Sequence, residues 1–328
     1  MTTTEGPGAL RLRFPSVPLP RPHYESVYCV LVHPSEPSAL WLRTTVRKPP
    51  GQPARGAVWV TWFGADGVRA TKVDDVDVAP DTPGLRCGPA SLGPTGSRGE
   101  VIASSLDCRW DLSFAPRTAR LEHLRPAGLY RAPLPRTKAT SPLPDLDVTG
   151  MLVADGRPVD LTGWTGMLGH NWGSEHAARW LWLRAAGLGT DGTGWLDVIA
   201  GRVRIGSVLS PWTAFGALEL DGARHRLGGL LSRGADVRVE HDGAVVRLPG
   251  RRLLVAVRAS VEPQRVVAWE YADPGGGRHE VVNCSVARLS LDVDVRGTHR
   301  VLEPARRGVL ELGGDERAFD VPLQPHRD

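Results

Sequence analysis

Cysteine, lysine and long apolar runs are all scarce in this 328-residue sequence, and each shortage excludes a class of protein. The four cysteines, Cys29, Cys87, Cys108 and Cys284, lie far apart without a C-x-x-C pair, which argues against a zinc site or a disulfide framework. No run of about 18 apolar residues occurs, and the N-terminal segment has no apolar stretch, so we expect neither a membrane-spanning helix nor a cleaved signal peptide. We therefore expect a cytoplasmic protein with reduced thiols.

An excess of charge of one sign is missing as well. The sequence has 40 basic and 36 acidic residues, and three of the basic ones are lysines, namely Lys48, Lys72 and Lys138. The arginines are scattered among acidic residues, so the basic face that nucleic-acid binding needs is not visible. We expect no nucleic-acid partner.

Motifs for metal binding or nucleophilic catalysis are also absent. His170 and His176 do not have the spacing of metal ligands on either a helix or a strand, so we expect no metal site. A Ser-His-Asp site would need an elbow such as G-x-S-x-G, and the sequence contains none.

The periodicity of the apolar residues is that of strands. Apolar positions at i, i+3, i+4 and i+7 are not sustained over a window of about 11 residues, so helices are not indicated. In residues 57–63, Trp59 and Thr61 fall on one face while Val58, Val60 and Trp62 fall on the other, which is the period of a strand. Similar runs separated by Pro, Gly and Asp-Gly turns predict strands at 26–32, 39–46, 57–63, 100–104, 108–113, 147–153, 158–164, 179–185, 195–204, 253–259, 265–271, 279–289 and 308–313.

The predicted fold class is all-β, with two consecutive antiparallel β-barrels packed together, because many short strands must close up to hide their edges. Prolines interrupt the strand pattern between residues 126 and 144, and a proline cannot donate to a strand ladder. We place the domain boundary there, which gives an N-terminal barrel at residues 1–140 and a C-terminal barrel at residues 141–328. A barrel of this size can hold one small ligand in its interior.

The densest group of functional residue types lies in residues 166–182, which read G-M-L-G-H-N-W-G-S-E-H-A-A-R-W-L-W. This stretch combines large indole rings with titratable and amide groups, and that mixture lines apolar pockets that have a few placed polar groups. The candidate pocket residues in it are His170, Asn171, Trp172, Glu175, His176, Trp180 and Trp182.

Several motifs agree with those of a known family. They are W-D-L at 110–112, T-S-P-x-P at 140–144, D-V-T-G at 147–150 and, above all, G-H-N-W-G at 169–173. Together they resemble the tandem lipocalin-like family that includes the carotenoid hydratases (hydroxyneurosporene synthases), the tocopherol cyclases and the lipocalin-like Diels–Alderases. The resemblance runs from H-Y-E-S at 23–26 to N-C-S at 283–285, and so covers most of the chain.

The resemblance implies two successive lipocalin-like barrels and a pocket lined by His170 and Trp172. In the carotenoid hydratases an Asp on the strand after the motif, preceded by an aromatic residue, is the suspected proton donor to an alkene. Asp197 has the matching place, but it follows Leu196 rather than a tyrosine. That departure argues against carotenoid hydration itself.

Asp197 can also be assessed from the residues alone. Protonating an alkene or assisting a cyclisation needs a carboxyl group whose pKa is raised by burial. On an alternating strand Asp197 shares a face with Trp195 and Ile199, which favours burial. If the preceding hairpin is symmetric about its loop, Arg184 lies opposite, and an ion pair would keep the carboxylate charged and structural. Both interpretations stay open.

The motif residues also have two interpretations. If the motif is extended, His170 and Trp172 face the same way and Asn171 faces the other way. In the functional interpretation, His170 is a proton shuttle and Trp172 is a wall of the pocket that stabilises a cation. In the structural interpretation, the motif is a bulge that locks the two barrels together. Glu175 could equally cap a short helix. Further candidate pocket residues, each of which could instead belong to the core or to a satisfied polar network, are Trp195, Trp212, His279 and Asn283.

Three functions fit these features. The first is an enzyme that binds an apolar small molecule (an isoprenoid, a polyketide or a lipid). It would use Asp197, His170 and Trp172 for acid-assisted hydration, cyclisation or pericyclic rearrangement without a cofactor. Its substrate could be loaded through transient contact with a membrane surface. The second is a non-catalytic carrier of such a ligand, and the third, ranked last, is a protein-interaction scaffold. A buried carboxyl group without a basic partner would favour the enzyme, and a paired one the carrier.

Overall fold

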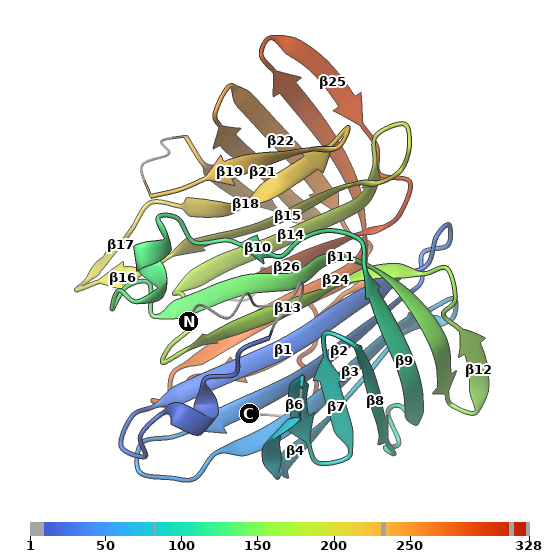
Figure 1. Ribbon diagram of the computed structural model, residues 1–328, viewed down its shortest axis with the longest axis vertical. Coiled ribbons are helices and arrows are strands. Elements are labelled where there is room, and N and C mark those ends of the chain that lie inside the picture. The colour runs from blue at the N-terminus through green and yellow to red at the C-terminus, as the bar shows by residue number, and fades with distance from the viewer. Residues whose placement is uncertain (1–9, 82, 231–233, 315–317, 326–328) are drawn as a thin grey trace, which may run out of the picture.

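The computed structural model describes residues 10–81, 83–230, 234–314 and 318–325 (Figure 1). Within these ranges the chain forms strands β1 to β26 and three 3-10 helices, with no α-helix, which confirms the predicted all-β fold class. None of the helical segments in these ranges has the length and apolar character needed to cross a membrane.

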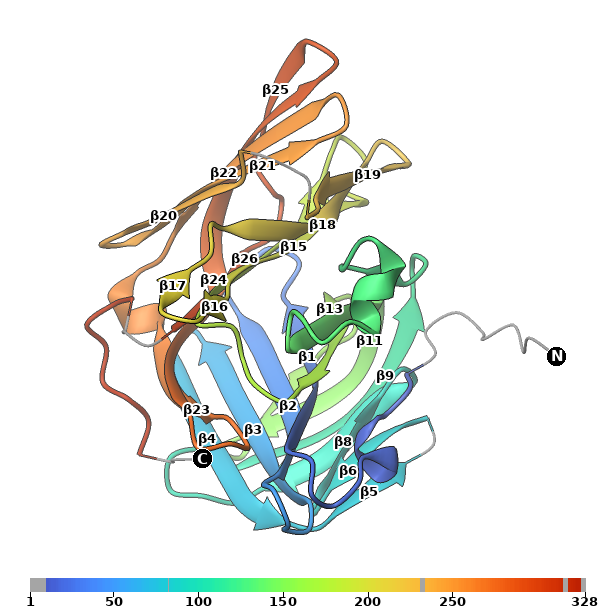
Figure 2. The same cartoon turned by 90° about the vertical axis from the view of Figure 1, so that its left-hand side faces the viewer.

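The first sheet contains thirteen strands from the first half of the chain and lies in the lower part of Figures 1 and 2. Its path runs β4-β3-β2-β1-β13-β11-β9-β8-β7-β6-β5, with β10 and β12 paired to β11. Its end strands are β4 and β5, so the barrel is nearly closed. The strands are β1 His23–Val32, β2 Ala39–Lys48, β3 Arg55–Gly64, β4 Gly67–Val76, β5 Val78–Asp81, β6 Gly84–Cys87, β7 Ala90–Gly93, β8 Gly96–Val101, β9 Cys108–Pro116, β10 Leu121–Glu122, β11 Thr137–Ala154, β12 Arg157–Asp160 and β13 Thr165–Gly173.

The second sheet contains eleven strands and lies above the first in Figure 2. Its path runs β19-β18-β15-β14-β26-β24-β22-β21-β20, with β23 and β25 paired to β24. A pairing of Leu227 with Gly250 joins β19 to β21, so this sheet closes on itself. The strands are β14 Arg179–Leu188, β15 Gly194–Arg202, β18 Thr213–Leu220, β19 Ala223–Gly228, β20 Asp236–Glu240, β21 Gly243–Gly250, β22 Leu253–Ser260, β23 Val267–Ala272, β24 Arg278–Val295, β25 Thr298–Leu302 and β26 Gly308–Gly314.

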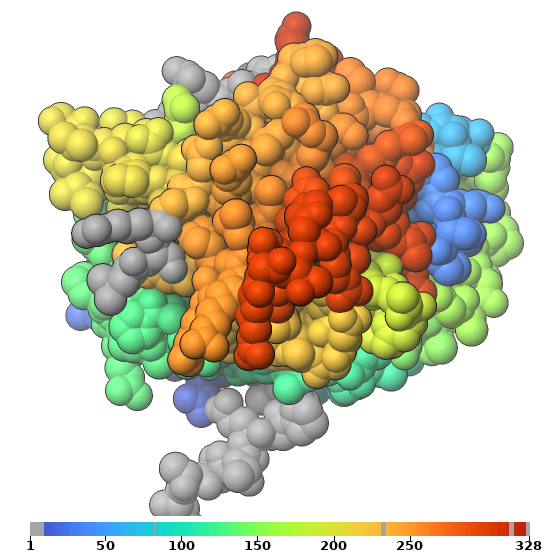
Figure 3. Space-filling model, turned by 90° about the horizontal axis from the view of Figure 1, so that it is seen from above, coloured from blue at the N-terminus to red at the C-terminus, as the bar shows by residue number. Residues whose placement is uncertain are grey.

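Short elements complete the fold. Strands β16 (Arg204–Ile205) and β17 (Val208–Leu209) form a separate hairpin between the second-sheet strands β15 and β18. The 3-10 helices are η1 Phe14–Ser16, η2 Ala127–Tyr130 and η3 Pro263–Arg265. Seen from above, the surface is made mainly by the second half of the chain, in yellow to red (Figure 3).

Side-chain alternation on β1 shows how the sheets pack. Val27 and Leu31 belong to the core inside the first sheet, whereas Val30 and Val32 belong to the core that includes the second sheet. Because both faces of β1 are covered, nine of its ten residues are buried. This explains why residues 26–32 form a near-continuous apolar run rather than an alternating one.

An aromatic cluster joins the two sheets. The ring of Trp269 on β23 lies edge-on to Trp59 of β3, at a centroid distance of 5.1 Å, and 6.3 Å from Trp41 of β2. Tyr271 lies 5.4 Å from Trp59. Rings of this size remove a large apolar area from water, so this contact stabilises the packing of one sheet on the other.

The chain passes from the first sheet to the second between Gly173 and Arg179, which corrects the sequence-based assignment. The boundary predicted at residue 140 falls inside β11, and the G-H-N-W-G motif lies on β13 of the first sheet, not in the C-terminal barrel. Pro142 and Pro144 fit into β11 because its pairing with β13 shifts register between Thr140 and Leu143, and again before residue 146. Such irregular positions tolerate a residue without an N–H donor. The prolines therefore mark an irregular strand rather than a linker.

Gly169, the first glycine of the motif, is needed for packing between the sheets. A Cβ at Gly169 would lie 2.2 Å from Cζ of Tyr28, its cross-strand partner on β1. The Tyr28 ring lies over this glycine and meets the edge of Trp182 on β14 at a centroid distance of 5.2 Å. The glycine thus allows a first-sheet side chain to contact the second sheet.

We predict that Gly169→Ala lowers the free energy of unfolding by about 1–3 kcal/mol, the usual cost of overpacking a core. Gly275→Ala is the control, because a Cβ there meets nothing within 4 Å. It should change the stability by less than about 0.5 kcal/mol. Urea denaturation of both variants measures the effect, and wild-type stability of Gly169→Ala would show that the close approach of Tyr28 is not required.

Candidate functional site

A cavity of about 420 Å³ has walls from both sheets. Tyr28, Trp41 and Arg43 line it from the first sheet, and Trp182 and Glu311 line it from the second. From the sequence we expect the ligand space inside a single barrel. The interior of the first barrel is instead filled by its own apolar core. The space lies where the two sheets meet.

Four of the residues predicted to line the pocket are on this wall: Asn171, His176, Trp180 and Trp182. Oδ1 of Asn171, Nε2 of His176 and Nε1 of Trp41 are buried without a hydrogen-bond partner among the described residues. Buried polar atoms are nearly always satisfied in folded proteins. Three residues of the cavity wall therefore each carry a polar atom whose hydrogen-bonding capacity is unused in this structure.

Glu311 places a carboxyl group on the cavity wall. Its position follows from strand register, because it pairs with Trp182 of β14 on one side and with Asn283 of β24 on the other. Oε1 accepts a hydrogen bond from Nε1 of Trp180 at 3.0 Å. Oε2 accepts one from Nδ2 of Asn283 at 3.3 Å and one from the Tyr271 hydroxyl at 3.5 Å. Burial raises the pKa of Glu311, and the nearby Arg43 and these donors offset the rise only in part.

Two neighbouring residues hold this arrangement in place. Oγ of Ser285 donates to Oδ1 of Asn283 at 3.0 Å, which leaves the amide nitrogen directed at Glu311. A Cβ at Gly313 would lie 2.1 Å from the Trp180 ring, so this glycine lets the indole lie across β26. Asn283, predicted to bind a ligand, thus supports the carboxyl group that lines the cavity.

The face of β13 that meets the cavity is that of Asn171. His170 and Trp172 share the opposite face, as the alternation predicts, and their rings stack at a centroid distance of 4.6 Å. Trp172 also stacks on Tyr130 at 6.0 Å. Within the described residues, neither His170 nor Trp172 belongs to the cavity wall.

His170 is bonded to a buried carboxylate instead. Its Nε2 lies 2.7 Å from Oε1 of Glu25, and Oε2 of Glu25 accepts the backbone N–H of Phe14 at 2.7 Å. Burial by itself would raise the pKa of Glu25, but hydrogen bonds from His170 and His23 hold it at about 2. Burial lowers the pKa of His170 more than Glu25 raises it. These contacts tie the segment before β1 to β13 within the first sheet. They differ from the predicted bulge that would lock the two barrels together, because β13 pairs with β1 in unbroken register through the motif.

Asp197 is fully buried and lies outside the cavity wall as far as the structure describes it. Its Oδ2 accepts a hydrogen bond from Oγ of Ser141 at 2.5 Å and lies 3.5 Å from Nε2 of His123. Its Oδ1 accepts one from Nε1 of Trp182 at 3.0 Å. Burial would raise the pKa of Asp197, but His123, Ser141 and Arg184 outweigh burial and lower it.

The predicted hairpin register is correct, since Arg184 lies opposite Asp197. The guanidinium group, however, donates to the carbonyl oxygens of Pro144 at 2.6 Å and of Gly166 at 2.7 Å, both in the first sheet. It also lies 3.5 Å from a carboxylate oxygen of Asp145. Arg184 therefore connects the two sheets. The raised pKa that a proton donor needs is found at Glu311 rather than at Asp197.

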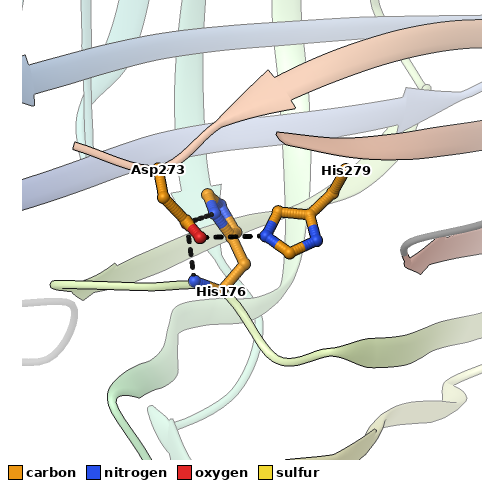
Figure 4. A group of neighbouring side chains, drawn as sticks. All are labelled: His176, Asp273 and His279. Carbon is orange, nitrogen blue, oxygen red and sulfur yellow. Dashed lines mark hydrogen bonds and ion pairs between the residues drawn. The ribbon is translucent and has the colours of Figure 1, made fainter. Parts of the chain in front are cut away.

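Three further groups converge beside the cavity (Figure 4). His176 comes from the segment between the sheets, while Asp273 and His279 come from the hairpin that joins β23 to β24. Nδ1 of His176 lies 2.6 Å from Oδ1 of Asp273, and Nε2 of His279 lies 2.9 Å from Oδ2. These are the described residues whose donor atoms are close enough together to hold a metal ion. The prediction of no metal site had considered His170 and His176, which the fold does not bring together.

The remaining predicted pocket residues have other surroundings. Glu175 forms an exposed ion pair with Arg136. Trp195 is fully buried, with the Arg224 guanidinium 4.9 Å from its ring centre. Trp212 lies near Arg202, at 6.0 Å. Glu175, Trp195 and Trp212 are not among the described residues that line the cavity.

The cavity-lining residues that were not predicted from the sequence include Tyr28, Arg43, Tyr271 and Glu311. One signal was present at Glu311, which is a single acid within the apolar run V-L-E-L at 309–312. A charged residue on the buried face of a predicted strand indicates either a structural ion pair or a functional group.

No family model matches this sequence. Two relatives are uncharacterized proteins of Mycobacterium tuberculosis, Rv0493c of strain H37Rv and MT0513 of strain CDC 1551. Each is 27% identical over 276 residues, which cover 82% of this chain and 80% of the relative.

Solved structures share the fold at low sequence identity. A protein of Nitrosomonas europaea, provisionally assigned as AttH, has a TM-score of 0.53 at 15% identity, covering 90% of this chain and 93% of its own. CghA, solved with Sch210972, has a TM-score of 0.57 at 13% identity, with coverages of 91% and 89%. Kievitone hydratase from Nectria haematococca has a TM-score of 0.50 at 8% identity, with 95% of both chains covered. The tandem lipocalin-like fold implied by the sequence motifs is thereby confirmed.

The low pKa of Glu25 predicts how stability depends on pH. A carboxyl group with a folded-state pKa of about 2, below its ordinary 4.5, contributes stability that is fully present above pH 4.5 and is lost as the pH falls through 2. We predict that Glu25→Gln loses on the order of 3 kcal/mol of unfolding free energy at pH 7. The difference from wild type should shrink at pH 3. Urea denaturation at both pH values measures this, with the exposed Glu36→Gln as control. A pH-independent difference would contradict the assignment.

Proposed function

We propose that this protein binds an apolar small molecule in the cavity between its two sheets and transforms it by acid-assisted hydration, cyclisation or pericyclic rearrangement. Glu311 is the proton donor in this proposal. The observation that carries the proposal is a carboxyl group of raised pKa on the wall of a cavity built mostly from apolar and aromatic side chains. The substrate class is an isoprenoid, a polyketide or a lipid.

The chemistry requires a carboxyl group that holds a proton and can release it. In a hydration, the Glu311 O–H bond breaks as a new C–H bond forms on an alkene carbon, and a cation develops on the neighbouring carbon. Tyr28, Trp41 and Trp182 present rings to the cavity, and such rings stabilise positive charge over their faces. Water then adds to the cation, and the proton that it loses restores the Glu311 carboxyl group.

The hydrogen-bond partners of Glu311 suit this role. Trp180, Tyr271 and Asn283 are neutral donors. Together with the nearby Arg43 they offset only part of the rise that burial causes in the pKa of Glu311. They can still stabilise the carboxylate after the proton has left. Arg43 also lines the cavity, and its guanidinium lies 4.0 Å from the Tyr271 ring centre, where it can orient a polar end of the substrate.

Two of the proteins that share the fold support an enzyme of this type. One is a hydratase by name, kievitone hydratase, and CghA was solved with the small molecule Sch210972 bound. A non-catalytic carrier is the second candidate, because Asp197, the acid that the sequence motif points to, is paired with His123.

We predict that protein purified from its own host carries an apolar compound, visible as a mass adduct in native mass spectrometry. With that compound or its precursor as substrate, Glu311→Gln should lower kcat by about 100-fold or more, the usual contribution of a general acid. The affinity for the ligand should stay within a few-fold of wild type, since the amide keeps the shape of the carboxyl group.

Asp197→Asn is the comparison that decides between the two carboxyl groups. If it abolishes turnover while Glu311→Gln retains it, the proton donor is Asp197. If ligand is bound but no turnover is detected in wild type, the protein is a carrier. Near-UV circular dichroism of both variants shows whether the fold is retained.

A further inference from the structure

We propose that His176, Asp273 and His279 bind a divalent first-row transition metal ion, of which zinc is the representative, at the edge of the cavity. The three donor atoms all lie within 4.8 Å of one another. Two imidazoles and one carboxylate form a nitrogen and oxygen donor set that zinc and its neighbours use, whereas magnesium and calcium prefer oxygen ligands alone. Figure 4 shows the Asp273 carboxylate joined by dashed lines to both imidazole rings.

The donor atoms lie close enough together to share an ion after small shifts. The Asp273 oxygens lie 2.6 Å from Nδ1 of His176 and 2.9 Å from Nε2 of His279. Tetrahedral ligands at about 2.0–2.2 Å from a zinc ion lie about 3.3–3.6 Å from one another, so each of these two contacts would open by about 0.5–1 Å to admit the ion.

The charge balance of the cluster favours a cation. The Asp273 side chain is 6% exposed, and its ionisable partners within the described residues are the two imidazoles. A carboxylate buried to this extent favours a bound cation, because a buried charge is costly unless it is paired or coordinates a metal.

The cluster is held in position by its surroundings. The backbone N–H of Asp273 donates to the carbonyl of Gly277 at 2.7 Å, which closes the hairpin that carries Asp273 and His279. A Cβ at Gly277 would lie 2.8 Å from Oδ2 of Asp273, so the glycine leaves room for the carboxylate. The Tyr24 ring stacks on His176 at a centroid distance of 4.1 Å. Rigid support of this kind is what a metal site needs from its outer contacts.

The cluster also has access to the cavity. His176 lines the wall, and three protein ligands leave at least one coordination position for water or for an oxygen of a bound molecule. Trp180 stacks on His176 at 5.5 Å and donates to Glu311, so the ion and the carboxyl group would flank the same indole. The metal site does not depend on the acid chemistry proposed above, because its assembly involves neither Glu311 nor a substrate.

Metal binding by untagged protein tests the inference, since a histidine tag would bind metal by itself. After chelator treatment and buffer exchange, the wild type should bind one equivalent of Zn²⁺ in calorimetry. It should also bind one equivalent of Co²⁺, with visible absorption bands of a nitrogen and oxygen site. Mg²⁺ and Ca²⁺ should not compete. Asp273→Asn and His279→Ala should weaken Zn²⁺ binding by about 100-fold or more, because the loss of even an outer partner of a ligand costs 10–100-fold.

His241→Ala is the matched control, because His241 lies beside Asp242 at the surface, 92% exposed, and should bind Zn²⁺ like wild type. Glu311→Gln should also bind Zn²⁺ normally, which separates this inference from the proposed proton donor. If the stripped wild type shows no saturable binding of Zn²⁺ or Co²⁺, the cluster is a hydrogen-bonded triad and the inference is wrong. Equal binding by folded Asp273→Asn would overturn it as well.

Discussion

The face-to-face packing of the two sheets is the constraint on which the rest of the structure depends. A polar group that is buried at this interface costs free energy unless it finds a partner there, since an unpaired buried group costs more than a hydrogen bond contributes. Arg184 of the second sheet meets this requirement by donating hydrogen bonds to backbone carbonyls of the first sheet. Asp197 meets it by accepting a hydrogen bond from Ser141 of the first sheet. These bonds specify how one sheet sits on the other. The cavity lies between the same two sheets, so its shape depends on them.

Local sequence patterns predicted the strands and one part of the cavity, because alternation is a property of neighbouring residues. The fold class, the register of Arg184 against Asp197 and the opposite directions of Asn171 and His170 all follow from a period of two. Alternation alone does not say which face meets the cavity. Asn171 rather than His170 faces the cavity because of which sheet covers each face of β13. That depends on contacts between residues far apart in the sequence.

Glu311 and Asp273 could not be placed from the sequence for the same reason. Strand β26 lies between β14 and β24, so Glu311 meets Trp182 and Asn283, which are far from it in the chain. Asp273 meets His176 because the segment between the sheets crosses the β23–β24 hairpin. The predicted domain boundary is wrong because prolines in a sequence argue against a central strand, whereas β11 accommodates Pro142 and Pro144 at shifts of register.

The pKa of each buried carboxyl group reflects a balance between burial and the groups around it. Glu25, Asp197 and Asp273 each lie against an imidazole, and in each case the pKa is lowered despite burial. Asp145 has a raised pKa, but it contacts guanidinium groups and lies away from the cavity in the described structure. Glu311 has a raised pKa, accepts its hydrogen bonds from an indole, an amide and a phenol, and faces the cavity. In the proposed reaction, a raised pKa and a position on the cavity wall are the two properties that a proton donor needs, and Glu311 combines them.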